Sequence, residues 1–178
     1  MFLSPYFSII DKAKSFNKII PKYLRYIGSK YEVIKDKKNN KGESFVEIKE
    51  FKLEIIPTFL EGPTRYLKVV NEHKEALNVY ETIKKSELYD NKFNFYKTGT
   101  DLTNESPEIG RIHAFTKGWL ERESNFLHMT YKYMLSILNA GLYDEFYKEI
   151  KTNYTCFMDP NVYGRSPFEH SSFIAPSN

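Results

Sequence analysis

The feature that most constrains the fold is a stripe of large apolar residues between positions 120 and 138. The stripe consists of Leu120, Leu127, Tyr131, Met134 and Leu138, at spacings of 7, 4, 3 and 4 residues. Such spacings place the side chains on a single face of an α-helix. The Asn-Ala-Gly sequence at 139–141 predicts the end of this helix. Residues 142–153 are predicted to form a second helix that packs back against the first.

The N-terminal third of the chain combines a helical and a β-type pattern. Residues 6–19 have the apolar spacing of a helix, which Pro21 interrupts. From Ser29 to Pro57 the sequence alternates or runs apolar around a KKNNKG turn, which predicts a β-hairpin. We therefore assign residues 1–60 to a segment made of a helix and a β-hairpin.

Helical patterns dominate the rest of the chain. Residues 64–85 return to helical spacing, with Thr64 as the predicted N-cap. Residues 88–108 are rich in turn residues and predict a long, function-bearing loop. The predicted fold class is therefore mainly α with a small β-hairpin element near the N-terminus, and residues 61–178 are predicted to form helical hairpins.

Composition excludes some functions and leaves others open. Aromatic residues make up 16% of the chain, which fits contacts with sugars or bases but equally fits the codon usage of an AT-rich genome. The net charge is only +3, and the basic cluster at residues 35–41 is interrupted by Asp36, so nucleic-acid binding is not expected. Cys156 is the single cysteine and the four histidines lack metal-type spacing, so neither a disulfide nor a metal site is expected.

The sequence predicts neither a membrane-spanning segment nor a signal peptide. No apolar run approaches the ~20 residues of a membrane span. The first residues, MFLSPYFSIIDKAK, lack a basic region and a small-residue cleavage site. We therefore expect a cytoplasmic protein.

The predicted central helix also carries polar residues at helical spacing. Glu121, Asn125, His128 and Lys132 lie 4, 3 and 4 residues apart. On a helix, Glu121 and His128 would be about 10.5 Å apart along the axis, a span that brackets a sugar-sized ligand. The alternative is a solvated helix face with stabilising side-chain pairs.

Three further residues are candidates for ligand contact. Trp119, directly after Gly118, is either a stacking platform or a core anchor. Arg111 and Arg165 each follow a glycine. A glycine allows the backbone to approach a ligand closely, and the arginine fork suits phosphate oxygens.

Several segments together resemble a known enzyme family. These segments are EIIPTFLEGP, SELYD, GRIHAFTKGWLERESNFLHM and DPNVYGRSPFEHSSFIA. Over residues 23–175 the chain resembles the C-terminal half of the catalytic region of large clostridial proteins related to cellobiose phosphorylase. These proteins are inverting glycoside phosphorylases of glycoside hydrolase family 94. The family's Glu–aromatic–His motif falls on Glu121, Phe126 and His128.

The chain departs from the family pattern at two places. Arg122 and Glu123 stand where the wider family often has small residues, and Ser166-Pro167-Phe168 stands where it has Glu-Pro-Tyr. These departures leave the substrate open.

The resemblance implies an (α/α)6 barrel, of which this chain would hold a part, and phosphorolysis of β-glucosides to a sugar 1-phosphate. The implied substrate-binding residues are Glu121, Trp119, Phe126 and His128, and the implied phosphate-binding residues are Arg111, His128 and Arg165. Inorganic phosphate would be the co-substrate, with no other cofactor and no metal. The expected partners are a disaccharide or oligosaccharide β-glucoside, phosphate, and the missing part of the barrel on another polypeptide, without nucleic acid or membrane.

The resemblance also places the catalytic Asp upstream of the residues present here. The expectation is therefore an enzyme fragment that lacks activity alone. One alternative is a non-catalytic helical module for carbohydrate binding or for assembly. A third reading, a hydrolase with Glu121 as its acid, is the least favoured.

Overall fold

The structure, a computed structural model, describes residues 22–164 and 172–177. The predicted helix over residues 6–19 and the candidate residue Arg165 lie outside the described residues. The chain divides into two compact units. Residues 23–56 form one unit, and the residues from Pro57 onward belong to the other.

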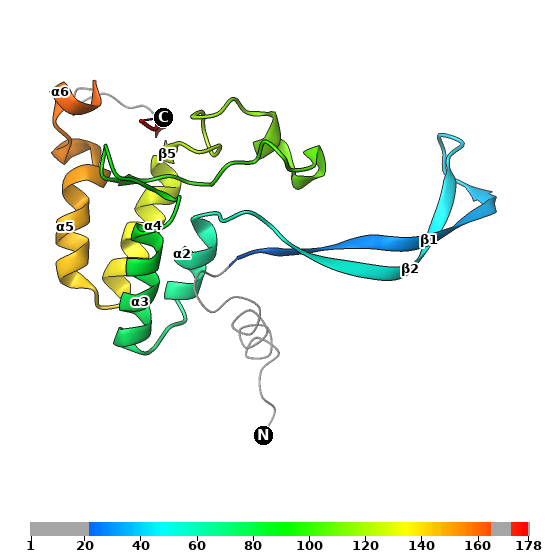
Figure 1. Ribbon diagram of the computed structural model, residues 1–178, viewed down its shortest axis with the longest axis horizontal. Helices are drawn as coiled ribbons and strands as arrows, with labels where there is room; N and C mark the ends of the chain where they lie inside the picture. The colour runs from blue at the N-terminus through cyan, green and yellow to red at the C-terminus, as the bar shows by residue number, and fades with distance from the viewer. Residues whose placement is uncertain (1–21, 165–171, 178) are drawn as a thin grey trace. The chain divides into compact units, whose positions relative to one another are not determined.

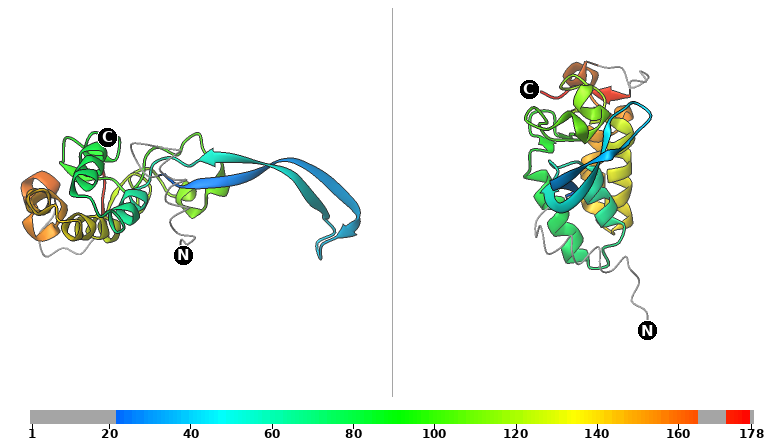
Figure 2. Two further views of the ribbon diagram at one scale, coloured as in Figure 1. Left: turned by 90° about the horizontal axis from the view of Figure 1, so that it is seen from below. Right: turned by 90° about the vertical axis from the view of Figure 1, so that its right-hand side faces the viewer.

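The first unit is the predicted β-hairpin, which the structure confirms. Strand β1 (Leu24–Lys38) pairs antiparallel with β2 (Ser44–Ile55), and the two strands twist around each other (Figure 1; Figure 2). The Asn39 side chain holds the turn, because its Oδ1 accepts the backbone N–H groups of Lys41 at 2.9 Å and Glu43 at 3.0 Å. Gly42 supplies the left-handed backbone that this turn needs, with φ of 81°.

The second unit is built around four helices that lie side by side in Figure 1. They are α2 (Glu61–Leu67), α3 (His73–Lys84), α4 (Leu127–Asn139) and α5 (Tyr143–Asn153), with a short α6 (Pro160–Tyr163) near the chain's end. Helix α4 packs against α2 and α5, and α2 also packs against α3. The core between them contains Leu60, Leu67, Ile83, Leu88, Tyr96, Tyr133, Met134, Ile137 and Leu142. The predicted pairing of two helices around Gly141 is thereby confirmed.

Short strands and turns connect these helices. Strand β3 (Tyr89–Asp90) pairs with β4 (Phe95–Tyr96), and β5 (Asn125–Phe126) pairs with β6 (Phe173–Ile174), both antiparallel. The 3₁₀ turns span Pro107–Ile109 (η1), Arg111–Ala114 (η2) and Thr155–Phe157 (η3). The predicted long loop over residues 88–108 therefore begins with a small β-hairpin.

The predicted fold class is wrong. The described residues contain five helices and three two-stranded antiparallel sheets, with 38% helix and 26% strand, and do not form a mainly α barrel of helical hairpins. The single helix predicted over residues 64–85 is two helices, α2 and α3. The break falls at Val69, Val70 and Asn71, residue types with low helix propensity. Thr64 lies inside α2 instead of capping a helix.

A buried carboxylate fastens the chain's last described residues to the β3–β4 turn. Asp90 Oδ1 accepts the backbone N–H groups of Lys92 at 2.9 Å and Phe93 at 3.0 Å and the Ser177 hydroxyl at 2.9 Å. Its Oδ2 accepts the Ser177 N–H at 2.7 Å. Burial alone raises the pKa of the Asp90 carboxyl, but the hydrogen bonds from the turn and from Ser177 outweigh burial and hold the pKa below its ordinary value.

This arrangement predicts a pH-dependent loss of stability. Asp90→Ala is expected to lower the free energy of unfolding by about 2 kcal/mol at neutral pH, because it removes the acceptor of these hydrogen bonds. The folded pKa lies below the unfolded value of about 4, so the unfolded chain binds the proton first as pH falls. The contribution of Asp90 is therefore complete above about pH 5 and is lost as pH falls through the folded pKa.

Urea unfolding of the wild type and of Asp90→Ala at a series of pH values measures this difference. Asp36→Ala is the control, because Asp36 is exposed in β1 near the hairpin turn. A wild-type advantage over Asp90→Ala that stays constant as the solution is acidified would contradict the assigned role.

Candidate functional site

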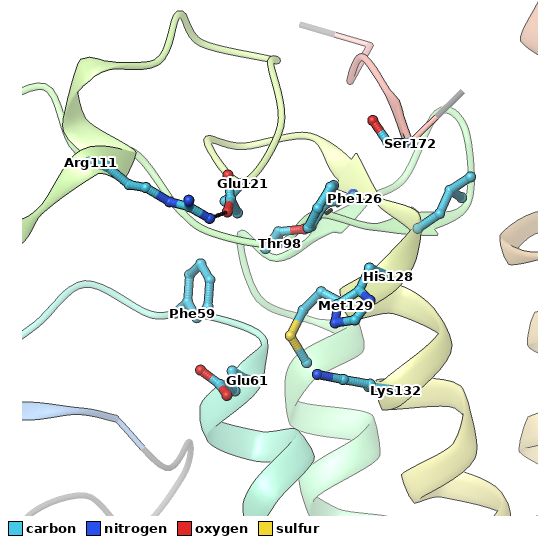
Figure 3. A pocket seen from close by; sticks show the side chains of 11 residues that line it. Phe59, Glu61, Thr98, Arg111, Glu121, Phe126, His128, Met129, Lys132 and Ser172 are labelled. Carbon is cyan, nitrogen blue, oxygen red and sulfur yellow. Dashed lines mark hydrogen bonds and ion pairs between the residues drawn. The ribbon is translucent and has the colours of Figure 1, made fainter. Parts of the chain in front are cut away.

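A pocket of about 540 Å³ opens in the helical unit at the beginning of α4 (Figure 3). Its walls come from α2, from the segment after β4, from the loop between η2 and β5, and from the first turns of α4. The residues that line it are Phe59, Glu61, Thr98, Arg111, Glu121, Phe126, Leu127, His128, Met129, Lys132 and Ser172. Cations, carboxylates and aromatic rings therefore share one pocket.

Strand pairing positions the start of α4 in this pocket. The Phe126 N–H donates to Thr98 Oγ1 at 3.2 Å, and the Leu127 N–H donates to the Ser172 carbonyl at 3.0 Å. No side chain caps the helix, which begins directly after Phe126. The backbone N–H groups of His128 and Met129 find no acceptor among the described residues. Such free N–H groups carry the positive end of the helix dipole.

Three cationic or potentially cationic side chains line the same pocket. His128 and Lys132 are exposed and lie one turn apart on α4. Arg111 comes from η2, and its side chain is 81% exposed. Arg111 Nη2 donates to Glu121 Oε1 at 2.7 Å, as the dashed line in Figure 3 marks. All three therefore line the pocket, two from α4 and one from η2.

Two carboxylates complete the polar lining. Glu121 uses Oε1 for Arg111, whereas its Oε2 is buried and has no hydrogen-bond partner among the described residues. Glu61, at the start of α2, accepts the Arg65 Nε–H at 2.9 Å. Figure 3 shows Glu61 and Lys132 on facing sides of the pocket. The lining can thus accept hydrogen bonds from hydroxyl groups and donate them to an anion.

The turn that carries Glu121 is held by an unusual backbone and by one arginine. Leu120 and Glu123 have positive φ values of 48° and 58°, which are uncommon for residues other than glycine. Arg122 Nη1 donates to the carbonyl oxygens of His113 at 2.8 Å and Phe115 at 2.9 Å. Arg122 therefore ties the turn to the segment that follows Arg111 in η2.

The prediction that Glu121, Asn125, His128 and Lys132 lie on one face of a helix is wrong. The helix begins at Leu127, so Glu121 lies in a turn and its distance from His128 is not set by helix geometry. Asn125 is fully buried, and its Oδ1 accepts the Thr130 hydroxyl at 2.6 Å. The prediction failed because the positive φ values at 120 and 123, which break the helix, fall on residues that are not glycine.

The structure brings together four of the six predicted site residues: Arg111, Glu121, Phe126 and His128 all line the pocket. Trp119 is not among the described lining residues. The residue is 46% exposed, and its ring packs edge-on against that of Phe115 at a centroid distance of 5.1 Å. Arg165 lies outside the described residues. The proposed roles of these residues in binding sugar and phosphate remain predictions.

Sequence reasoning missed several lining residues. Phe59 and Glu61 belong to EIIPTFLEGP, a segment singled out only for its resemblance, and Thr98 lay in the predicted loop. Lys132 belongs to the predicted polar face but not to the predicted site; it and His128 are the two residues of that face that α4 contributes to the pocket. Only the tertiary contact between α2 and α4 brings Glu61 to this site.

Comparisons with known proteins do not assign the chain to a family. No model of a protein family, no curated protein and no solved structure matches the chain. Within residues 22–164 and 172–177, no group of three or more metal-ligating side chains gathers. None of the helices in that part of the chain has both the length and the apolar character needed to cross a bilayer.

Proposed function

We propose that the pocket at the start of α4 binds a sugar together with phosphate. The chain would then be the substrate-binding part of a cytoplasmic enzyme similar to cellobiose phosphorylase, which converts a β-glucoside and phosphate to a sugar 1-phosphate. The observation that carries the proposal is the combined lining: anion-binding groups at the start of α4 face carboxylates and aromatic rings across one pocket.

The phosphate is assigned to the α4 side of the pocket. The free N–H groups of His128 and Met129 suit the oxygens of a phosphate group, as helix N-termini generally do. The side chains of His128 and Lys132 add donors from the same helix. Arg111, which lies across the pocket beside Glu121, offers the remaining N–H groups of its planar fork to phosphate oxygens. Because inorganic phosphate is itself an anionic nucleophile, these groups need only hold it in line with the anomeric carbon.

The sugar is assigned to the opposite wall. The buried, unpartnered Oε2 of Glu121 is an acceptor for a sugar hydroxyl, and Glu61 offers further acceptor oxygens. The ring of Phe59 on this wall, and that of Phe126 beside His128, provide apolar faces for the C–H groups of a sugar ring. A ligand that carries both a sugar and a phosphate would satisfy both walls at once.

Turnover also requires a general acid that protonates the glycosidic oxygen. The resemblance assigns this acid to an Asp upstream of the matched segments, and we assign that role to no residue of the pocket. The isolated chain is therefore expected to bind ligand without releasing product. Formation of a sugar 1-phosphate by the purified chain would contradict this part of the proposal.

Titration calorimetry with glucose 1-phosphate tests the binding. Glucose 1-phosphate is expected to bind more tightly than glucose or phosphate alone. His128→Ala and Lys132→Ala are each expected to weaken binding about tenfold, because each removes a charge-assisted hydrogen bond. A ligand that binds equally well without its phosphate would favour the alternative of a carbohydrate-binding module.

The matched control is His73→Ala. His73 is exposed at the start of α3, much as His128 is near the start of α4, but does not line the pocket. Binding should be unchanged in His73→Ala. An equal loss in His73→Ala and His128→Ala would mean that the pocket is not the binding site.

A further inference from the structure

The β-hairpin of residues 23–56 lacks a core of its own. All of these residues are described, and none of them is buried. Eight large apolar side chains are nonetheless exposed in its strands: Tyr26, Tyr31, Val33, Phe45, Val46, Ile48, Phe51 and Ile55. An isolated two-stranded hairpin is marginally stable in water, because it has no second layer to cover its apolar side chains.

Irregularities in the strand pairing gather most of these side chains on one face. Register shifts occur between Gly28 and Lys30 and between Lys30 and Tyr31. Without them, simple alternation would place Tyr31 on the opposite face from Tyr26. With them, five directly opposed pairs share one face: Leu24 with Ile55, Tyr26 with Leu53, Gly28 with Phe51, Tyr31 with Ile48, and Val33 with Val46.

Two contacts confirm this assignment of faces. A Cβ atom placed on Gly28 would meet the Ile48 side chain at 3.2 Å, so Ile48 points to the same face as Gly28. The rings of Tyr26 and Phe51 pack edge-on with a centroid distance of 6.5 Å. We call this surface the apolar face of the hairpin.

The other face carries the charges of the two strands, and they pair with one another. Lys30 Nζ lies 2.6 Å from Glu50, and Arg25 Nη2 lies 2.9 Å from Glu54. Lys49 Nζ lies 2.9 Å from Glu47 and 3.2 Å from Glu32. The apolar face contains no charged residue among its five pairs. A partner for that face therefore needs an apolar surface and no complementary charge.

We propose that the apolar face packs against the same face of a second copy of this chain. In a dimer with two-fold symmetry, the same surface of each copy contacts the other copy. Two antiparallel sheets can pack face to face in this way at a distance of about 10 Å. The three aromatic residues of this face are 61–69% exposed, and its valines and isoleucines are about half exposed. Covering all of them would remove on the order of 600 Å² per copy from water. That area reaches the lower range of stable interfaces.

Sedimentation equilibrium of the full chain over about a hundredfold range of concentration tests the proposal. The wild type is expected to form a dimer with twice the 21.1 kDa mass of the chain. Phe51→Glu is expected to be monomeric, because it places a charge in the apolar face. Phe45→Glu is the matched control, since Phe45 lies on the same strand and is also half exposed but pairs with Ile34 on the opposite face.

Val46→Glu, a second change on the apolar face, should also give a monomer, and circular dichroism checks that each variant keeps its strands. A dimer for the wild type and for Phe45→Glu, with monomers for the other two, supports the proposal. A wild type that stays monomeric at every concentration overturns the proposal. In that case another segment of the chain or another protein would cover the face. Equal dissociation of Phe45→Glu and Phe51→Glu overturns it as well.

Discussion

Replacing Tyr133 by alanine is expected to lower the free energy of unfolding by about 4 kcal/mol, the usual cost of removing a fully buried ring. Tyr133 lies in the middle of α4 with no exposed surface, and its ring packs edge-on against that of Tyr96 at 4.8 Å. The change would leave a cavity between α4 and the β3–β4 hairpin. Urea unfolding at one fixed protein concentration measures the loss.

Tyr133→Phe separates the ring from its hydroxyl. The Tyr133 hydroxyl is buried and has no hydrogen-bond partner among the described residues. Its removal should therefore leave the free energy of unfolding within about 1 kcal/mol of the wild type or raise it. If Tyr133→Phe were as destabilising as Tyr133→Ala, the hydroxyl and not the packing of the ring would be the stabilising group.

The second large effect is expected at a buried charge that links α3 to α5. The Glu149 side chain is 2% exposed, accepts the Tyr80 hydroxyl at 2.6 Å and forms an ion pair with Lys84. Lys84→Met keeps the length of the side chain but leaves Glu149 buried without a cation. We expect a loss of about 2–3 kcal/mol in the free energy of unfolding, since Lys84 is itself partly solvated.

Lys85→Met is the control for this change. Lys85 directly follows the last residue of α3 as its C-cap, is well exposed, and its Nζ lies 3.6 Å from Glu81 Oε2. A solvent-exposed pair contributes little, so its loss should change stability by no more than about 0.5 kcal/mol. If the two methionine variants unfold at the same urea concentration, the Lys84–Glu149 pair is not a stabilising contact.

How far the sequence predicts this fold depends on the range of the interactions involved. The β1–β2 hairpin and the α4–α5 pair follow from local signals, namely alternation around a turn and helical spacing before Gly141. The short strands β5 and β6 do not, because they depend on contacts between distant segments. The barrel implied by the family resemblance is also wrong, because similarity over short segments does not determine how helices are arranged.

The candidate site shows the same division between local and distant information. The Glu–aromatic–His motif at Glu121, Phe126 and His128 points to residues that share the pocket, although the helix once expected to carry all three begins only at Leu127. Glu61 and Phe59 reach the pocket through the packing of α2 on α4, which no local spacing encodes. The positive φ values of Leu120 and Glu123 could not be predicted either, because leucine and glutamate seldom adopt them.

The backbone amide NMR spectrum during titration with glucose 1-phosphate tests the central claim, a sugar-phosphate site at the start of α4, most directly. The amides of His128 and Met129 should shift in a saturable manner, because their free N–H groups would acquire phosphate oxygens as acceptors. Titration with glucose should move them far less, and the amide of His73 should stay in place in both experiments. Unmoved amides at His128 and Met129 under saturating glucose 1-phosphate would contradict the assignment of this pocket.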